Sequence, residues 1–290
     1  MRALVALLAL AGCSAVTGSR TYAVYDADGG DPVRLTLELA EPESGEGHPA
    51  IVFVHGGGWE GGSLADHRYL ERIDEAASRG YVAFTIDYRL TAESVGDRAR
   101  FRWPAPLEDL RCAIRWLRRH ADRFEVDPER IGVAGHSAGG HLGLMAALEP
   151  GAVDPAWCPW DADDSVQAVV SFAGPGDLGL LEQVTDWWVR PKIPRLLGLA
   201  PGTTAAEAPA AYAAASPVSF ATDRAPPLLL IQGTADPIVP PEVTTETVRV
   251  LRAAGAAVEE LSLPGADHTL EGHRETEAMW DFFARHLGGE

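Results

Sequence analysis

The sequence has few basic residues, few cysteines and almost no lysine. Its 290 residues include 24 lysines and arginines against 42 aspartates and glutamates, which gives a formal net charge of −18 at pH 7. Lys192 is the single lysine. Nucleic acids and anionic membranes attract basic surfaces, so this charge argues against both as partners. After the N-terminus there is no apolar run long enough for a membrane-spanning helix.

The first residues have the pattern of an export signal. Arg2 precedes a short apolar run over Ala3–Leu10, which is too short to span a bilayer and indicates a signal peptide. The run ends in Leu10-Ala11-Gly12-Cys13, which resembles the lipobox of bacterial lipoproteins. In that family the signal is removed before the cysteine, and the cysteine is then acylated.

The lipobox resemblance implies a signal peptide over 1–12, a lipid anchor on Cys13 and a short tether over 13–20. It also implies that Ser14 is not an inner-membrane retention signal, so the outer membrane is the expected destination in a Gram-negative cell. The membrane contact would then be through this anchor alone. The alternative is an ordinary signal peptide cleaved after Ala15, which would give a secreted or periplasmic protein.

Two cysteines remain after Cys13, namely Cys112 and Cys158. In an exported protein an even pair of cysteines can form a disulfide. Cys112 lies on an expected helix and Cys158 in a loop that follows a neighbouring helix. The alternative of two buried free thiols stays open at this point.

Strand-like and helix-like patterns alternate along the chain, which predicts an α/β fold with a mostly parallel sheet flanked by helices. We expect one domain over 21–290, with an irregular, cap-like insertion over 176–220. The expected strands are Tyr22–Asp26, Val33–Glu41, Ala50–His55, Tyr81–Asp87, Arg130–Ala134, Val166–Ala173, Pro227–Gln232 and Val258–Leu263. The expected helices are Asp66–Arg79, Pro104–Phe124, His141–Leu148, Pro241–Ala254 and Thr276–Leu287.

A candidate nucleophile lies at Gly135-His136-Ser137-Ala138-Gly139, between an expected strand and an expected helix. A Gly-x-Ser-x-Gly in this position is typical of a nucleophile elbow, in which a sharp turn exposes the serine hydroxyl. The two glycines allow the strand and the helix to pass close to each other. Ser137 is therefore the candidate nucleophile.

The candidate base is His268, because it follows the last expected strand. The candidate acid that orients it is Asp236, on the turn after the preceding strand. Two other acids compete for this role. Asp267 is adjacent to His268, where sequence neighbours rarely face each other, and Glu242 begins a helix whose N-terminus it would stabilise.

The segment His55-Gly56-Gly57-Gly58-Trp59 is the candidate oxyanion loop. Glycines after a strand allow backbone N–H groups to turn inward. We expect the donors to be the N–H groups of Gly57, Gly58 and Ala138. His55 is expected to brace the loop, and Trp59 either lines an acyl pocket or packs beneath the loop.

With these motifs the chain resembles the α/β-hydrolase superfamily, in its esterase branch with a His-Gly-Gly-Gly loop, and within it the exported carboxylesterases grouped with bifunctional feruloyl and acetyl-xylan esterases. The resemblance implies an eight-stranded α/β-hydrolase fold and a serine ester hydrolase that uses neither cofactor nor metal. It further implies the chain order Ser137, Asp236, His268. The closer match is carried by His55–Trp59, Asp87–Leu90, Pro104–Arg119, Asp127–Ile131, Gly135–His141, Ser216–Val218 and Gly233–Val239.

Tyr88, Arg89 and Asp109 also match this pattern, and we expect them to be structural because we place none of them on a loop near Ser137. The expected substrate is a short-chain or aromatic ester, or an esterified plant polysaccharide. Two other functions stay open. One is an arylformamidase or other amide hydrolase of the same fold, and the other is a non-catalytic surface binding protein. The sequence does not indicate an oligomeric state.

Overall fold

A computed structural model describes residues 18–26, 31–92, 94–95, 98–149, 157–185, 187–270, 272 and 274–288. The expected signal peptide over 1–12, Cys13 and most of the tether lie outside the described residues. Within the described ranges, no helix has both the length and the apolar character needed to cross a membrane.

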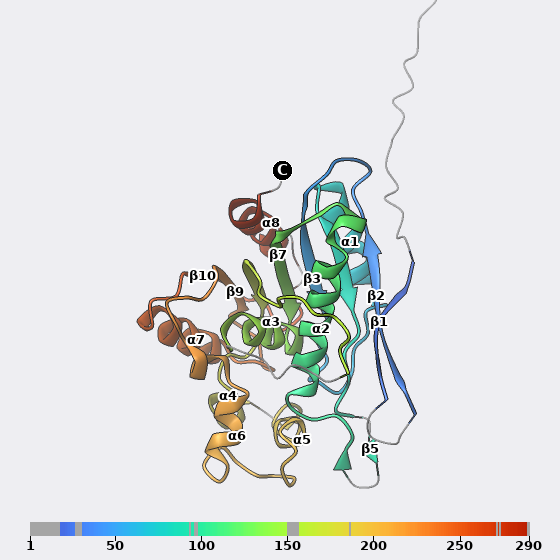
Figure 1. Cartoon of the computed structure of the whole chain (residues 1–290). Helices are drawn as coiled ribbons and strands as arrows, with labels where there is room; N and C mark the ends of the chain where they lie inside the picture. The colour runs from blue at the N-terminus through green and yellow to red at the C-terminus, as the bar shows by residue number, and fades with distance from the viewer. Residues whose placement is uncertain are drawn as a thin grey trace, which may run out of the picture.

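An eight-stranded sheet forms the centre of the molecule (Figure 1), which confirms the predicted α/β-hydrolase architecture. The strand order is β1-β2-β4-β3-β7-β8-β9-β10. β2 pairs antiparallel with β1 and with β4, and the remaining pairs are parallel. The strands are β1 Arg20–Tyr25, β2 Val33–Ala40, β3 His48–Val54, β4 Val82–Ile86, β7 Val126–His136, β8 Ala168–Phe172, β9 Leu228–Gly233 and β10 Val258–Leu263. Two short strands, β5 Ser94–Val95 and β6 Arg98–Ala99, pair with each other outside this sheet.

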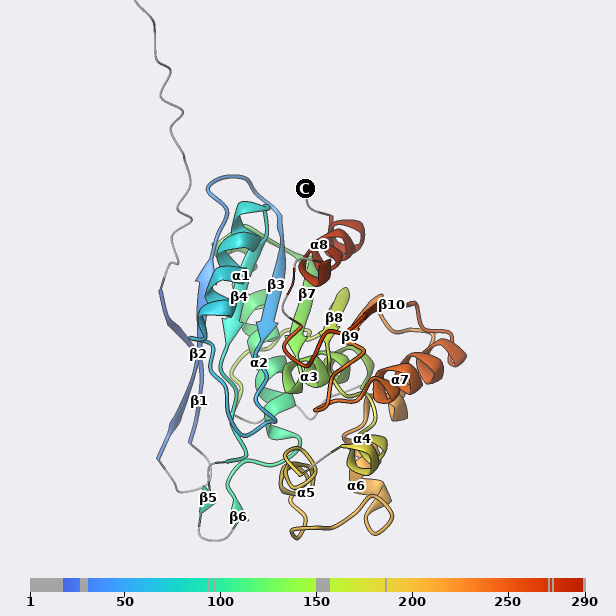
Figure 2. The ribbon, with the colours of Figure 1, turned by 180° about the vertical axis from the view of Figure 1, so that it is seen from behind.

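Helices cover both faces of the sheet (Figure 2). One hydrophobic core joins the sheet to α2, α3 and α7, and a second joins the opposite face to α1 and α8. Parallel strands buried on both faces have continuous apolar sequences, and this explains the apolar run Ala50–Val54 in β3. The helices that cover the sheet are α1 His67–Ser78, α2 Ala105–Arg119, α3 Ala138–Leu148, α7 Pro241–Ala253 and α8 Arg274–Leu287.

One predicted helix is shorter in the structure than the sequence pattern indicated. The expected helix over Pro104–Phe124 ends at Arg119, and a separate 3-10 turn, η1 Ala121–Phe124, follows it. Glu125 then takes a left-handed conformation with φ 54°. This turn reverses the chain into β7, which starts at Val126 because that residue already pairs with His48 of β3. A left-handed residue cannot be recognised from apolar periodicity, so the pattern continued past the true end of the helix.

The segment expected to be cap-like, which we call the cap, has three short helices and a 3-10 turn in its described residues, 176–185 and 187–220. These are α4 Leu178–Val184, α5 Lys192–Leu196, α6 Pro209–Ala214 and η2 Pro217–Phe220. The ribbon places α4, α5 and α6 together below the carboxyl ends of the parallel strands (Figures 1 and 2). The apolar side chains of the cap form a third core that includes Trp59 and Ala138. The cap therefore packs directly on the segments that contain the candidate site.

A disulfide joins Cys112 on α2 to Cys158, across 46 residues of sequence. The sequence left open whether these two thiols were bonded. Cys112 is fully buried in the core that α2 shares with α3. The bond therefore ties the segment that follows α3 back to α2.

We expect the double variant Cys112→Ala, Cys158→Ala to unfold at lower urea concentration, with a loss of about 2–4 kcal/mol in the free energy of unfolding. The physical reason is that a crosslink restricts the unfolded chain. Equilibrium unfolding followed by circular dichroism would measure the change, and reduced wild-type protein should match the variant. Equal midpoints for oxidised wild type and variant would contradict this expectation.

Candidate active site

The chain turns sharply at Ser137, between the end of β7 and the start of α3. Ser137 has φ 54° and ψ −117°, which is a strained backbone for a residue other than glycine. Its N–H donates to the carbonyl of Phe172 at the end of β8, at 2.7 Å. The turn leaves no room for side chains beside it, because a Cβ on Gly135 would collide with the backbone of Gly139. The predicted elbow geometry is therefore present.

The structure brings His268 and Asp236 into direct contact. His268 Nδ1 lies 2.8 Å from Asp236 Oδ2, in loops that follow β10 and β9. Because the carboxylate oxygen accepts, Nδ1 carries the proton in this pair, and Nε2 of the neutral ring is left as an acceptor. An imidazole held in this tautomer can accept a proton from a hydroxyl group.

Four donors hold the Asp236 carboxylate in one orientation. Oδ1 accepts from the N–H groups of Ile238 and Val239 at 2.8 and 3.0 Å. Oδ2 accepts from His268 and from Gln232 Nε2, the latter at 3.0 Å. The side chain of Asp236 is fully buried, so it has little freedom to turn away from the histidine.

Asp267 and Glu242, the two alternatives to Asp236, have different surroundings. Asp267 accepts from the N–H and hydroxyl of Thr269, at 2.9 and 2.7 Å. Glu242 lies in the first turn of α7 and lines a surface groove with α4. Of the three acids weighed, Asp236 is the one in contact with His268.

Gln232 and His136 support the site, and the sequence analysis did not single out either residue. Gln232 is buried at the end of β9, where its amide also donates to the carbonyl of Val239, and its oxygen accepts from Thr244 Oγ1 at 2.7 Å. A polar residue that ends an otherwise apolar strand is the sequence feature that could have drawn attention to it. His136 similarly follows the apolar run Ile131–Gly135 at the end of β7.

His136 connects the elbow to the histidine loop. Its Nε2 donates to the carbonyl of His268 at 2.7 Å, and the two rings lie 4.8 Å apart. Burial, followed by the nearby His268, lowers the pKa of His136 to about 4, so its ring is neutral above that pH. A neutral ring here adds no positive charge that would oppose protonation of His268.

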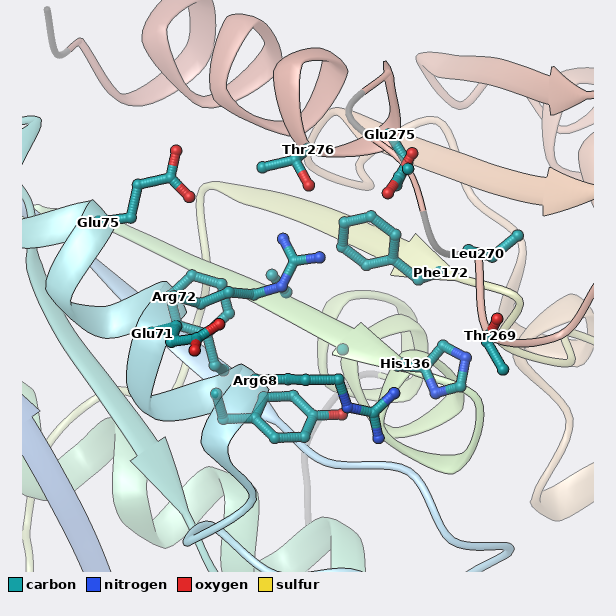
Figure 3. Close-up of a pocket in the computed structure, with 15 residues that line it drawn as sticks. Arg68, Glu71, Arg72, Glu75, His136, Phe172, Thr269, Leu270, Glu275 and Thr276 are labelled. Carbon is teal, nitrogen blue, oxygen red and sulfur yellow. The ribbon is translucent and has the colours of Figure 1, made fainter. Parts of the chain in front are cut away.

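His136 also lines a cavity of about 300 Å³ between α1 and α8 (Figure 3). Arg72 from α1 enters it with its guanidinium 5.2 Å from the centre of the Phe172 ring. Thr269 and Leu270, which directly follow His268, line the same cavity. The histidine loop thus borders this cavity on the α1 and α8 face of the sheet.

The glycine loop after β3 lies against the elbow. A Cβ on Gly56 would be 3.2 Å from the Cβ of Ser137. Gly57 and Gly58 have φ values of 123° and 61°, which favour glycine. Ala138 is the first residue of α3, where a helix has N–H groups without intrahelical acceptors. Backbone donors from two segments are thus close to the serine.

Two tyrosines and one histidine brace this loop. His55 is buried, stacks on Tyr88 with ring centres 4.3 Å apart, and its carbonyl accepts from the Tyr88 hydroxyl at 3.0 Å. Tyr69 of α1 accepts from the N–H of Gly56 at 3.2 Å. Tyr88 follows β4, and its hydroxyl contacts the loop that lies against the elbow, so the expectation that it is not on a loop near Ser137 is wrong. The sequence motif did not reveal that the ends of β3 and β4 are adjacent.

Arg89 and Asp109 form a buried ion pair. Arg89 Nε donates to Asp109 Oδ1 at 2.8 Å, and its guanidinium lies over the rings of Tyr25 and Trp157. Asp109 also accepts from the backbone N–H of Arg89 at 2.6 Å. These contacts join α2 to the segment after β4, so the ion pair has a structural role.

Trp59 packs beneath the loop. It is 2% exposed, and its indole lies in the core that the cap forms with Ala138.

Among the described residues, no group of three or more histidine, cysteine or acidic side chains could hold a metal ion. The site therefore combines a serine at a strained turn, a histidine whose Nδ1 contacts a buried acid, and glycine N–H groups.

Comparisons with known proteins agree with this geometry. The BD-FAE family model matches residues 37–251. Esterase LipC of Mycobacterium tuberculosis is 36% identical over 229 residues, which cover 76% of this chain and 52% of LipC. Esterase LipQ of the same organism is 31% identical over 253 residues, covering 83% of this chain and 57% of LipQ. The chain thus spans about half the length of these curated relatives.

Solved structures of Thermogutta terrifontis esterase 2 are also similar. The butyrate-bound form is 28% identical, with a TM-score of 0.73, over 92% of this chain and 93% of that one. The form phosphonylated by sarin is 27% identical, also with a TM-score of 0.73, over 92% and 94% of the two chains. The family model covers most of the sequence, and the chain belongs to the BD-FAE family.

Proposed function

We propose that the protein is a serine carboxylesterase with Ser137 as nucleophile, His268 as general base and Asp236 as the acid that orients it. The observation that carries this proposal is the contact between His268 and Asp236. His136, which directly precedes Ser137, donates to the carbonyl of His268 and so joins the histidine loop to the elbow. Membership of the BD-FAE family and the esterase names of the relatives support it.

In this mechanism Ser137 Oγ attacks the ester carbonyl carbon while its proton passes to His268 Nε2. The tetrahedral oxyanion accepts hydrogen bonds from the N–H groups of Gly57, Gly58 and Ala138. The intermediate expels the alcohol, which takes the proton from His268. Water then attacks the acyl-enzyme, gives its proton to the same nitrogen, and the acid leaves with Ser137 restored. Asp236 stays a carboxylate throughout and stabilises the imidazolium.

The proposed substrate is a small carboxylic ester with a short or aromatic acyl group, and an esterified polysaccharide is a narrower form of the same proposal. In its described residues the cap has short helices separated by turns, and this favours short acyl groups over long ones. One relative favours a second candidate, amide hydrolysis. Arylacetamide deacetylase of Oryctolagus cuniculus is 36% identical over 102 residues, which cover 34% of this chain.

We also propose that the mature chain is anchored to a bacterial membrane by acylation of Cys13. The support is the basic residue, apolar run and lipobox-like sequence at the N-terminus, which lies outside the described residues. Several acyl chains on one residue give durable anchoring, because each buried methylene contributes about 0.8 kcal/mol.

Replacing Ser137 by Ala is expected to abolish ester hydrolysis while the melting temperature stays close to that of the wild type. The assay is a p-nitrophenyl ester series from acetate to palmitate, with methyl ferulate, acetylated xylan and an aryl formamide beside it. Fast turnover of the acetate and butyrate esters by the wild type supports the proposal. Preference for the formamide would favour the amide hydrolase instead. If the wild type hydrolyses none of these substrates and is not labelled by a fluorophosphonate, this would favour a binding protein.

The variant Asp236→Asn should lower kcat by about 10⁴-fold, because its amide favours the wrong tautomer of His268. Glu242→Gln is the matched control and should change kcat little, since Glu242 lies in the groove beside α4. Steady-state hydrolysis of p-nitrophenyl acetate measures both variants. The reverse order of effects would move the orienting acid to Glu242.

Cys13→Ser should move the protein from the membrane fraction to the soluble fraction, because the thiol that carries the first acyl chain is lost. Fractionation of cells and immunoblotting would measure this, with Ser14→Ala as the control that keeps the cysteine. A wild type found entirely in the soluble fraction would contradict the anchor.

A further inference from the structure

The glycine loop needs support from outside itself. Gly57, Gly58 and Trp59 have consecutive positive φ values of 123°, 61° and 60°. Glycine takes this conformation freely, but it is also the residue with the most freedom to leave it. Trp59 is strained there, since a bulky side chain disfavours a positive φ. Such a conformation persists only where surrounding contacts impose it.

The first support reaches Trp59 from the cap through His141. The indole N–H of Trp59 donates to His141 Nδ1 at 3.2 Å. His141 Nε2 donates to the carbonyl of Ala215, at the end of α6, at 2.7 Å. A single neutral tautomer satisfies both bonds, and burial lowers the pKa of His141 to about 4, so this tautomer is kept above that pH. The carbonyl of Trp59 is fixed too, because the N–H of Thr91 donates to it at 2.8 Å.

The second support reaches Glu60 from α5. Glu60 accepts from Lys192 Nζ at 2.8 Å and from Arg195 at 2.5 Å. The carboxylate of Glu60 and the ammonium of Lys192 are largely buried, so solvent screens their attraction less than that of a surface pair. Lys192 is also the only lysine of the sequence.

Lys192 packs on the loop as well as pairing with it. A Cβ on Gly58 would lie 2.7 Å from Lys192 Cδ and 3.6 Å from the edge of the Trp188 ring. The ammonium of Lys192 lies 4.4 Å from the centre of that ring. The lysine stem therefore covers Gly58 from the side of the cap, and its charge is held between Glu60 and Trp188.

We propose that the cap positions the oxyanion donors, with Lys192 and His141 as positioning residues that hold the loop at Glu60 and Trp59. This rests on the proposed esterase function. Lys192 belongs to the cap, and His141 is hydrogen-bonded to it. The residues that they contact, Glu60 and Trp59, are the two that follow Gly58. Backbone donors stabilise a tetrahedral intermediate only when they are placed within a few tenths of an ångström. The cap thus acts on the chemical step in addition to covering the site.

Lys192→Met tests the second support, since it keeps the stem and removes the charge. We expect kcat for p-nitrophenyl acetate to fall about tenfold with KM little changed, because a misplaced donor weakens transition-state binding. The affinity of an alkyl trifluoromethyl ketone, whose serine adduct carries the oxyanion, should fall in the same proportion as kcat/KM. Lys192→Arg should restore most of kcat.

Arg190→Met is the matched control, because Arg190 is a cap cation that donates to the carbonyls of Glu182 and Thr185 within the cap. It should leave kcat unchanged. Glu60→Gln should act in the same direction as Lys192→Met, and the double variant should be no worse than the more affected single variant. Glu60→Gln keeps the test available if Lys192→Met fails to fold.

Trp59→Phe tests the first support, because it removes the indole donor to His141 and keeps an aromatic ring in the core. It too should lower kcat and ketone affinity together. Lower melting temperatures with unchanged kcat and ketone affinity in all these variants would overturn the proposal and leave the contacts a purely structural role. Absence of turnover and of serine labelling in the wild type would instead overturn the esterase function itself, and the positioning role with it.

Discussion

The close crossing of α3 over the ends of β3 and β7 is the constraint on which the site depends. A Cβ on Gly139 would collide with the carbonyl of Val54, and one on Gly135 with the backbone of Gly139. With glycine at both positions, the helix starts directly at the strand ends, and Ser137 is held at a strained turn there. The glycine loop after β3 lies so close to the serine that a Cβ on Gly56 would be 3.2 Å from the Cβ of Ser137. This packing thus brings the serine and the glycine loop together, and further contacts fix the conformation of the loop.

Buried polar side chains then fix the remaining groups, and neutral histidines have a large share in this. His136 and His141 are both buried, and burial lowers the pKa of each to about 4. Each donates from Nε2 to a backbone carbonyl, of His268 and of Ala215 respectively. A neutral imidazole can join two backbone segments without placing a charge in the core. One of these rings holds the base loop beside the elbow, and the other links the cap to the oxyanion loop.

The cap is bound to the site by several kinds of contact. Its apolar side chains form a core with Trp59 and Ala138, and its cations pair with Glu60. Under the proposed positioning role, a change in these contacts alters the rate of catalysis as well as the stability of the cap.

The sequence by itself determined the sheet, the elbow at Ser137 and the candidate partners His268 and Asp236, because each follows an apolar strand at a position that local patterns reveal. Tertiary structure decided among Asp236, Asp267 and Glu242, since only the packed loops show which carboxylate meets His268. It also joined Cys112 to Cys158 and gave His136 and Tyr88 their partners. These contacts connect residues far apart in the chain, or polar atoms whose acceptors are backbone carbonyls. Neither leaves a local pattern in the sequence, because the partner is supplied by the fold.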